Sequence, residues 1–244
     1  MDVRSELNLD YPATTASLLA RYLIVLEGED YSHQFDSANE VYVVISGVGE
    51  SVVDGETIDW QAGDIMYLPG GRMIHLQASA RAVLLVVTDE PLLLYFGTHV
   101  DEGRRGLSPT LFTRADIAAT LDRMSDQSDQ DVPGKAFVLM PVAADGVRSK
   151  RSVMAMALNT LEGHSAQRAH RHSPAALTLG LEASLLHSVV NGERVDWSQY
   201  ALMLTPPNAV HSHHNEGPSR MISFFVQDAW LHEYLDSGNF SFAD

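Results

Sequence analysis

Short runs of apolar and β-branched residues recur along the whole chain, and turn residues separate them. Such runs span residues 17–26, 41–45, 51–53, 65–68 and 83–87, and then 153–161, 176–181, 185–190, 202–205 and 221–226. Their spacing of roughly 8–12 residues is typical of an all-β sandwich or barrel. Two other stretches have helical spacing: residues 114–124, which follow the N-cap residue Thr113, and residues 229–235 in the tail.

The chain contains an internal repeat. Residues 51–60 (SVVDGETIDW) and 188–197 (SVVNGERVDW) are identical at seven of ten positions. Each copy carries an Asp-Gly or Asn-Gly dipeptide between β-branched residues, which predicts a hairpin with a type I′ turn. The same offset places His33 on His170. The repeat therefore predicts two similar β units.

The repeat divides the chain into three predicted parts. Residues 1–97 form an N-terminal barrel, and residues 136–244 form a C-terminal barrel. Between them, residues 98–135 are polar and acidic, and we interpret them as a linker with a short helix and a loose tract at 125–131. A length of 244 residues with 45% hydrophobic residues is enough for two small domains with their own cores.

The composition excludes several kinds of site and partner. The chain has no cysteine, so any metal must be held by histidines and carboxylates, and disulfides and thiolate nucleophiles are excluded. With 32 acidic and 16 basic residues, it has no basic stripe for nucleic acid. No apolar run approaches a membrane span, and the N-terminus lacks the features of a signal peptide. We therefore expect a cytoplasmic protein without nucleic-acid or membrane partners.

Histidines gather in the second half of the chain. Seven of the eleven lie between His164 and His214. His170 and His172 stand two residues apart on a predicted strand and so share a face, which His211 can reach from a later strand. Burying several imidazoles together is costly unless a divalent metal satisfies their nitrogens. Histidine ligands with open coordination positions suit iron, manganese, nickel, copper or zinc.

These motifs also carry a family resemblance. Residues 170–172 (HRH), 189–193 (VVNGE) and 204–215 (LTPPNAVHSHHN) resemble the barrel of the gentisate 1,2-dioxygenase group, and the duplication makes the whole chain resemble a bicupin of the cupin superfamily. The resemblance implies two jelly-roll barrels, with Fe(II) held in the second by the three histidines named above. It also implies that O2 and an aromatic substrate take the open positions, and that His213 contacts the substrate or supports the ligands.

The chain departs from the pattern of this group at several positions. Leu177 stands where the general cupin pattern has a glutamate, which indicates an all-histidine site. Thr178 stands where the dioxygenases carry an arginine, and Phe225 stands where they carry an aspartate. Both residues of the group are expected to contact the substrate's carboxylate and hydroxyls, so we expect an altered substrate here. Arg168 and His187, together with His213, are our candidate catalytic residues.

The N-terminal barrel has its own set of candidate ligands. His33, Glu40 and His75 together match a two-histidine, one-carboxylate site. The alternative is a degenerate barrel kept for packing and dimerisation. Phe35 stands at the position that corresponds to His172 and puts an aromatic ring where a ligand should be. We therefore predict that this barrel is metal-free.

The function that the residues and the resemblance together predict is a mononuclear, metal-dependent, ring-cleaving dioxygenase. The metal is expected to be Fe(II), with Mn, Ni and Zn as alternatives, and the substrates are O2 and a small aromatic or related organic acid. A non-enzymatic bicupin that binds a metal or small ligand, or a metal-dependent isomerase or lyase, is the competing hypothesis. The fold alone does not separate these functions. A homo-oligomer is left open.

Overall fold

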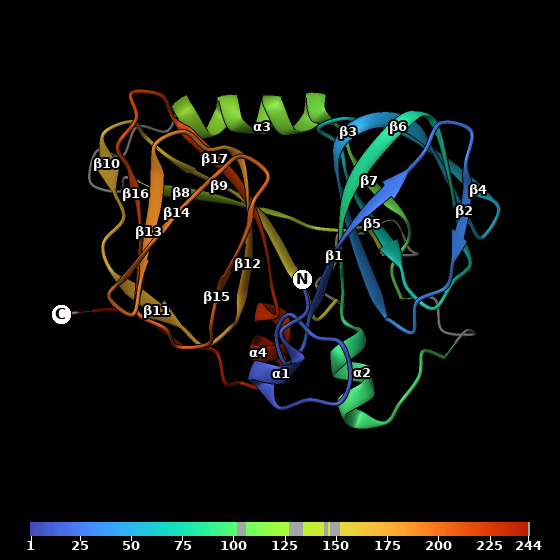
Figure 1. The fold of residues 1–244 in the computed structure, drawn as a ribbon, viewed down its shortest axis with the longest axis horizontal. Coiled ribbons are helices and arrows are strands. Elements are labelled where there is room, and N and C mark those ends of the chain that lie inside the picture. The colour runs from blue at the N-terminus through green and yellow to red at the C-terminus, as the bar shows by residue number, and fades with distance from the viewer. Residues whose placement is uncertain (102–105, 127–133, 144–145, 147–151, 244) are drawn as a thin grey trace. The chain divides into compact units, whose positions relative to one another are not determined.

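The computed structural model describes residues 1–101, 106–126, 134–143, 146 and 152–243. Most of its elements are β-strands in antiparallel ladders, which confirms the predicted predominance of β-structure (Figure 1). The chain divides into two compact units. The first unit comprises Met1–Ala119 and Pro141–Ser152, and the second comprises Thr120–Met140 and Val153–Asp244. Among the described residues, no helix is long and apolar enough to cross a membrane.

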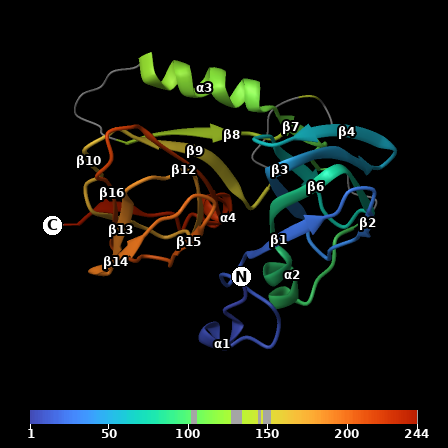
Figure 2. The same cartoon turned by 45° about the horizontal axis from the view of Figure 1, so that its top comes forward.

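The first unit is built on one seven-stranded sheet. Its strands are β1 (Leu19–Val25), β2 (Asp30–His33), β3 (Asn39–Val53), β4 (Glu56–Gln61), β5 (Ile65–Pro69), β6 (Ile74–Thr88) and β7 (Thr110–Phe112). They are ordered β1-β6-β3-β5-β7, while β2 pairs with β6 and β4 pairs with β3. Figure 2 shows β1 lying along β6. Along the chain, helix α1 (Arg4–Leu7) precedes β1, and helix α2 (Glu90–Phe96) lies between β6 and β7.

Two strands of this unit are longer than the sequence predicts. The runs at 41–45 and 51–53 belong to one continuous strand, β3, and residues 83–87 are only the end of β6. The β3–β6 ladder shifts register three times between Val44 and Gly49. Gly47 lies inside this stretch with a φ of 93°, a conformation that costs little only without a Cβ. The bulges let one strand bend while its pairing continues, so the apolar pattern is interrupted although the strand is not.

Apolar side chains from several strands of the first unit form one buried cluster. Its members include Tyr42, Trp60, Met66, Leu76 and Leu84, each no more than 2% exposed. They come from four strands, β3, β4, β5 and both halves of β6, whose alternate residues point inward. The indole N–H of Trp60 donates to the hydroxyl of Ser51 at 2.9 Å, so its polar atom is satisfied inside the core.

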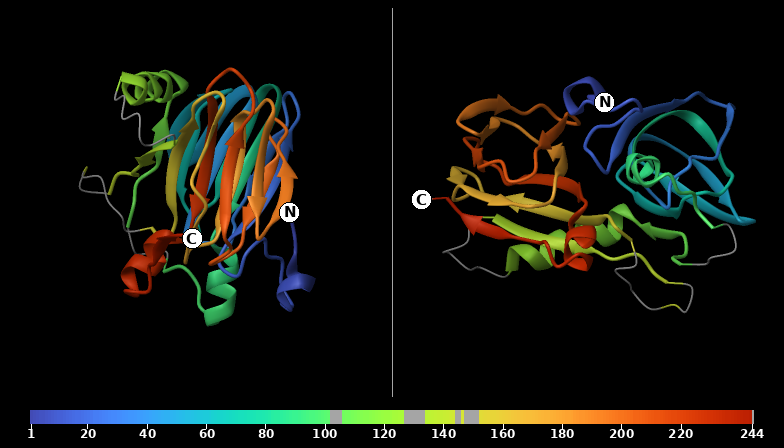
Figure 3. Two further views of the ribbon diagram at one scale, coloured as in Figure 1. Left: turned by 90° about the vertical axis from the view of Figure 1, so that its left-hand side faces the viewer. Right: turned by 90° about the horizontal axis from the view of Figure 1, so that it is seen from below.

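The second unit has two antiparallel sheets, which Figure 3 shows packed as two layers. Its strands are β8 (Gly134–Leu139), β9 (Ala155–Leu161), β10 (Ser165–Ala166), β11 (His170–His172), β12 (Ala176–Glu182), β13 (Leu186–Val190), β14 (Glu193–Asp196), β15 (Leu202–Thr205), β16 (His211–Asn215), β17 (Met221–Gln227) and β18 (Phe240–Phe242). One sheet has the order β14-β13-β16-β11-β18 with β10 paired to β16, and the other has the order β15-β12-β17-β9-β8.

The turns of the repeat adopt the predicted geometry in both units. Asp54 and Gly55 have φ values of 51° and 80°, and Asn191 and Gly192 have 49° and 86°. Two successive residues with positive φ define the type I′ turn, so both predicted hairpins are confirmed. They join β3 to β4 and β13 to β14.

The two predicted helices are confirmed within two residues of their ends. Helix α3 spans Arg114–Asp126, and the Thr113 hydroxyl accepts a hydrogen bond from the Asp116 amide at 3.1 Å. Helix α4 spans Ala229–Tyr234. The predicted loose tract at 125–131 lies mostly outside the described residues. Strand β18 follows α4 and was not predicted, because three residues carry too short a pattern.

A buried aspartate stands before α2 and another before α4. Asp89 Oδ1 accepts hydrogen bonds from the backbone amides of Ala38 at 2.8 Å and Asn39 at 3.0 Å. Asp228 Oδ1 accepts one from Ala175 at 2.9 Å, so the repeat extends to this contact. Burial raises the pKa of Asp89 to about 6, although the side-chain and backbone hydrogen bonds of Asn39 lower it.

Candidate metal centre

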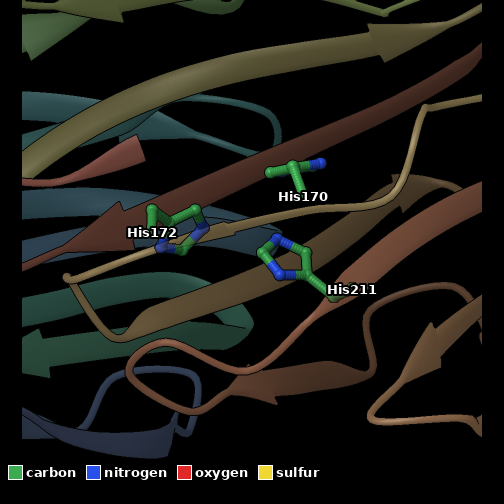
Figure 4. A group of neighbouring side chains, drawn as sticks. All are labelled: His170, His172 and His211. Carbon is green, nitrogen blue, oxygen red and sulfur yellow. The ribbon is translucent and has the colours of Figure 1, made fainter. Parts of the chain in front are cut away.

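Three histidines meet where strand β11 pairs with β16. His170 and His172 lie on β11, and the antiparallel register places His170 directly opposite His211 at the start of β16. One ligand atom from each of the three residues lies within 4.8 Å of the others, and the rings converge from the two strands (Figure 4). No other group of three or more histidines and carboxylates comes together in this way in the part of the chain that the structure describes.

Backbone carbonyls hold all three rings in the same tautomer. The Nδ1 atom of His170 lies 2.9 Å from the Arg168 carbonyl, that of His172 lies 2.8 Å from Pro174, and that of His211 lies 2.9 Å from Ala209. A carbonyl oxygen only accepts, so each Nδ1 carries the hydrogen and each neutral ring keeps a lone pair on Nε2. Metal-bound histidines are oriented by this kind of bond on the opposite nitrogen. The residues present therefore fit a divalent metal held by three imidazoles.

The surroundings of the cluster favour uncharged rings. Burial, together with the neighbouring His170 and His172, lowers the pKa of His211 to about 4. Burial also lowers the pKa of His172. Only a neutral imidazole can ligate a metal, so the rings of His172 and His211 are ready to bind one near neutral pH without losing a proton.

His213 lies next to the cluster but has a different hydrogen-bond pattern. Its ring centre is 5.6 Å from that of His211, and its Nδ1 lies 2.7 Å from the Ser188 hydroxyl. Ser188 also accepts a bond of 2.8 Å from the indole N–H of Trp197, which can only donate. The serine hydroxyl can then donate its own hydrogen to His213 Nδ1, which would leave the ring hydrogen on Nε2, or accept a hydrogen from Nδ1. Burial lowers the pKa of His213 to about 3, so the ring is neutral.

The structure does not bring His187 to the cluster. His187 pairs with His214 across β13 and β16, whereas its neighbour Ser188 pairs with His213. Adjacent strand residues point to opposite faces, so His187 and His214 stack with each other, at 4.6 Å between ring centres, on the face away from His213. Arg168 does lie near the cluster, because its carbonyl holds His170, but its side chain is exposed and stacks on Phe242 at 4.4 Å.

The candidate ligands of the first unit form a different arrangement. His33 Nε2 lies 2.7 Å from the hydroxyl of the buried Tyr42, which donates to the Glu40 carboxylate. The ring of Phe35 stands 4.3 Å from that of His33, centre to centre. His75 is exposed on β6, and its Nδ1 contacts the hydroxyl of Ser32 at 2.7 Å. His33 and Glu40 thus share a buried network that His75 does not join.

The positions that depart from the dioxygenase pattern lie together in the second unit. Thr178 on β12 pairs directly with Phe225 on β17. Leu177, next to Thr178, is 1% exposed. None of the three side chains carries a charge, so this part of the sheet supplies no ion pair for an acidic substrate.

Two features of the centre were not identified from the sequence. Strand β18 pairs with β11 and places Phe240 beside His172 in the ladder. Ser188 supports His213 through a hydrogen bond. Phe240-Ser-Phe242 has the alternation of a strand, but only its pairing partner could link it to the histidines. Ser188 lies in the repeat, where the matching Ser51–Trp60 pair gives no sign of a histidine contact.

Known proteins match this chain in sequence over a short segment only. No family model matches the chain. A segment of 74 residues is 32% identical to 5-aminosalicylate 1,2-dioxygenase from Comamonas sp and covers 30% of this chain and 20% of that protein. A segment of 73 residues is 29% identical to gentisate 1,2-dioxygenase from Haloferax sp, with the same two shares. The match thus spans about a fifth of the length of each curated relative.

The similarity of fold extends over nearly the whole chain. Salicylate 1,2-dioxygenase from Pseudaminobacter salicylatoxidans matches with a TM-score of 0.80 at 13% identity, over 96% of this chain and 77% of that one. Structures of that enzyme with gentisate match equally well. A cupin 2 conserved barrel domain protein from Leptotrichia buccalis matches with a TM-score of 0.57 at 10% identity, over 93% of this chain and 95% of that one.

The fold is therefore that of the cupins. The predicted resemblance to gentisate 1,2-dioxygenases is confirmed in sequence over the short matching segment, and the chain shares the fold of salicylate 1,2-dioxygenase. At 13% identity the structural likeness concerns the fold, and the chemistry must be argued from the residues of the site.

Proposed function

We propose that the chain is a bicupin dioxygenase whose C-terminal barrel, residues 136–244, holds one Fe(II) ion, and whose N-terminal barrel, residues 1–97, is metal-free. The substrates are O2 and a small aromatic or related organic acid. The observation that carries this proposal is the convergence of one ring nitrogen each from His170, His172 and His211, without a carboxylate, while each Nδ1 faces a backbone carbonyl. The similarity to 1,2-dioxygenases in fold and partial sequence supports the choice of reaction.

A divalent iron in this place would supply open coordination positions for substrate oxygens and O2. The protein's own part is to hold three neutral rings in one orientation. The carbonyls of Arg168, Pro174 and Ala209 do this, since each fixes the Nδ1 hydrogen of one histidine. Because these acceptors belong to the backbone, the orientation persists whether or not a metal is bound.

His213 has a different task in the proposed mechanism. With its hydrogen on Nε2, His213 would offer the site a hydrogen-bond donor, while the three ligand histidines offer lone pairs. The donor is held by the chain from Trp197 through Ser188 to Nδ1. A neutral N–H of this kind can orient a hydroxyl or carboxylate oxygen of the substrate without giving up its proton. Arg168 is the nearby cation that could attract an acidic substrate, and His187 has no part because it faces away.

Elemental analysis tests the metal site directly. We expect the protein, purified without chelators or a nickel column, to carry close to one equivalent of metal. Alanine at His170, His172 or His211 should remove most of it. His164→Asn is the matched control: His164 is an exposed loop histidine with a φ of 55°, which asparagine tolerates, and its variant should keep the metal. A triple alanine variant with stoichiometric metal would refute the site.

Oxygen consumption tests the reaction separately. Iron-loaded protein should consume O2 when one member of a panel of hydroxybenzoates and related acids is added, and the zinc-loaded protein should not. A protein that binds metal at the three histidines but consumes no O2 with any acid would support the competing function, a metal- or ligand-binding bicupin. Product formation without O2 uptake would indicate an isomerase or lyase.

A further inference from the structure

Two phenylalanines extend the face that carries the metal-ligating histidines. Strand β18 pairs with β11 in a register that sets Phe242 opposite His170 and Phe240 opposite His172. Directly opposed residues of an antiparallel pair project on the same side of the sheet. His211, His170 and Phe242 therefore form one row across β16, β11 and β18.

The rings of this strand contact the cluster at its open edge. The Phe240 ring lies 5.3 Å from that of His170, centre to centre, and 5.3 Å from that of Phe242, with the two phenylalanines at 85°. Both remain largely exposed, Phe240 at 57% and Phe242 at 51%. The guanidinium of Arg168 lies 4.4 Å above the Phe242 ring and adds a positive charge to the same edge.

We propose that β18 determines the substrate specificity of the site, and that Phe240 and Phe242 contact the ring of an aromatic carboxylate whose oxygens face the three histidines. This inference rests on the proposed metal site and deepens it by assigning the side chains that contact the ring of the substrate. The exposed surface of the two phenylalanines is apolar, so its contact with water is unfavourable. An aromatic ring placed beside them would bury this surface and add edge or offset stacking, both of which stabilise the bound state. Arg168 favours an anionic ring over a neutral one.

An edge strand with exposed aromatics could also pair with a second copy of the chain. Two observations favour the substrate instead. Each phenylalanine stands directly opposite a ligand histidine, and Phe240 contacts the ring of His170. A self-association surface would not require this register.

The test measures ligand binding to zinc-loaded protein, with metal content checked for every variant. Salicylate is the aromatic probe, and lactate, which offers a carboxylate and a hydroxyl without a ring, is the control ligand. Phe240→Ala should raise the Kd for salicylate about threefold to tenfold in calorimetric titration, and leave that for lactate unchanged. Phe240→Leu guards against a structural effect of alanine on β18, because it keeps an apolar side chain without the ring. It should show the same selective loss of salicylate affinity.

Ser241→Ala is the matched control on the same strand, because Ser241 pairs with Arg171 and projects from the opposite face. It should bind both probes as the wild type does. Equal salicylate affinity in the wild type and in both Phe240 variants would refute the proposed role of β18 and leave the metal site intact. A wild type that binds zinc but no salicylate would have the same consequence. Phe240 variants that lose only self-association on a sizing column would also refute that role. A wild type that binds no zinc would instead refute the proposed function.

Discussion

Replacement of Ser188 by alanine should change the tautomer of His213 while leaving the metal in place. Ser188 is fully buried, and its hydroxyl links the indole N–H of Trp197, at 2.8 Å, to His213 Nδ1, at 2.7 Å. A hydrogen bond between neutral groups contributes about 0.5–1.5 kcal/mol. At about 1.4 kcal/mol per tenfold, its loss should shift the tautomer ratio by roughly twofold to tenfold toward Nδ1–H.

The repeat supplies a matched control for this change. In the first unit Ser51 accepts the indole N–H of Trp60 at 2.9 Å, but its other contact is the Met66 sulfur at 4.0 Å rather than a histidine. Both Ser51→Ala and Ser188→Ala should lower the free energy of unfolding, by about 1–3 kcal/mol, because a tryptophan donor loses its acceptor. Only Ser188→Ala should also change the tautomer of His213.

The assay is long-range proton–nitrogen correlation spectroscopy of histidine-labelled, zinc-loaded protein. In the wild type, His170, His172 and His211 should carry their hydrogen on Nδ1, and His213 should carry it on Nε2. Ser188→Ala should shift His213 alone, and Ser51→Ala should shift none of them. A wild-type His213 with its hydrogen on Nδ1 would refute the reasoning, since the serine would then accept from both neighbours.

Three further predictions concern charge, stoichiometry and substrate. Burial raises the pKa of Asp89 from 3.8 to about 6, so between these pH values the folded chain holds a proton that the unfolded chain releases. The contribution of this group to the free energy of unfolding therefore falls by about 3 kcal/mol as the pH rises from about 4 to about 6. The free energy of unfolding in urea should fall by this amount between pH 4 and pH 7 in the wild type and in Asp228→Asn, but not in Asp89→Asn. The same pH dependence of this free energy in all three proteins would contradict the prediction. Metal titration should end at one equivalent per chain, because the ring of Phe35 stands against His33; a second bound equivalent would show that the first unit has a site. Iron-loaded protein should turn over gentisate only at millimolar concentrations, because Thr178 and Phe225 supply no charge for its carboxylate. The loss of a buried ion pair between an arginine and a carboxylate costs about 2–5 kcal/mol. Efficient cleavage at micromolar gentisate in a steady-state assay would show that these positions do not control binding.

Local patterns in the sequence were sufficient to predict much of the architecture. The alternation of apolar residues predicted the strands, and the Asp54-Gly55 turn and its repeated counterpart predicted the hairpins, because a type I′ turn requires positive φ at two adjacent residues. The spacing of His170 and His172 was enough to place both on one face. All of these features depend on residues that are close in sequence.

The features that complete the site depend on pairing between distant strands, which local patterns do not specify. The register of β16 on β11 sets His211 opposite His170, and the register on β13 turns His187 away from the cluster, although its sequence position suggested a role in the pocket. Strand β18 exists because β11 offers it a partner, and only that pairing brings Phe240 to the histidines. The sequence by itself therefore determined the β-rich architecture, the repeated hairpin and the choice of the three histidines that the structure brings together. The tertiary structure decided which side chains surround those histidines, because a shift of one residue in a strand's register moves every side chain to the other face.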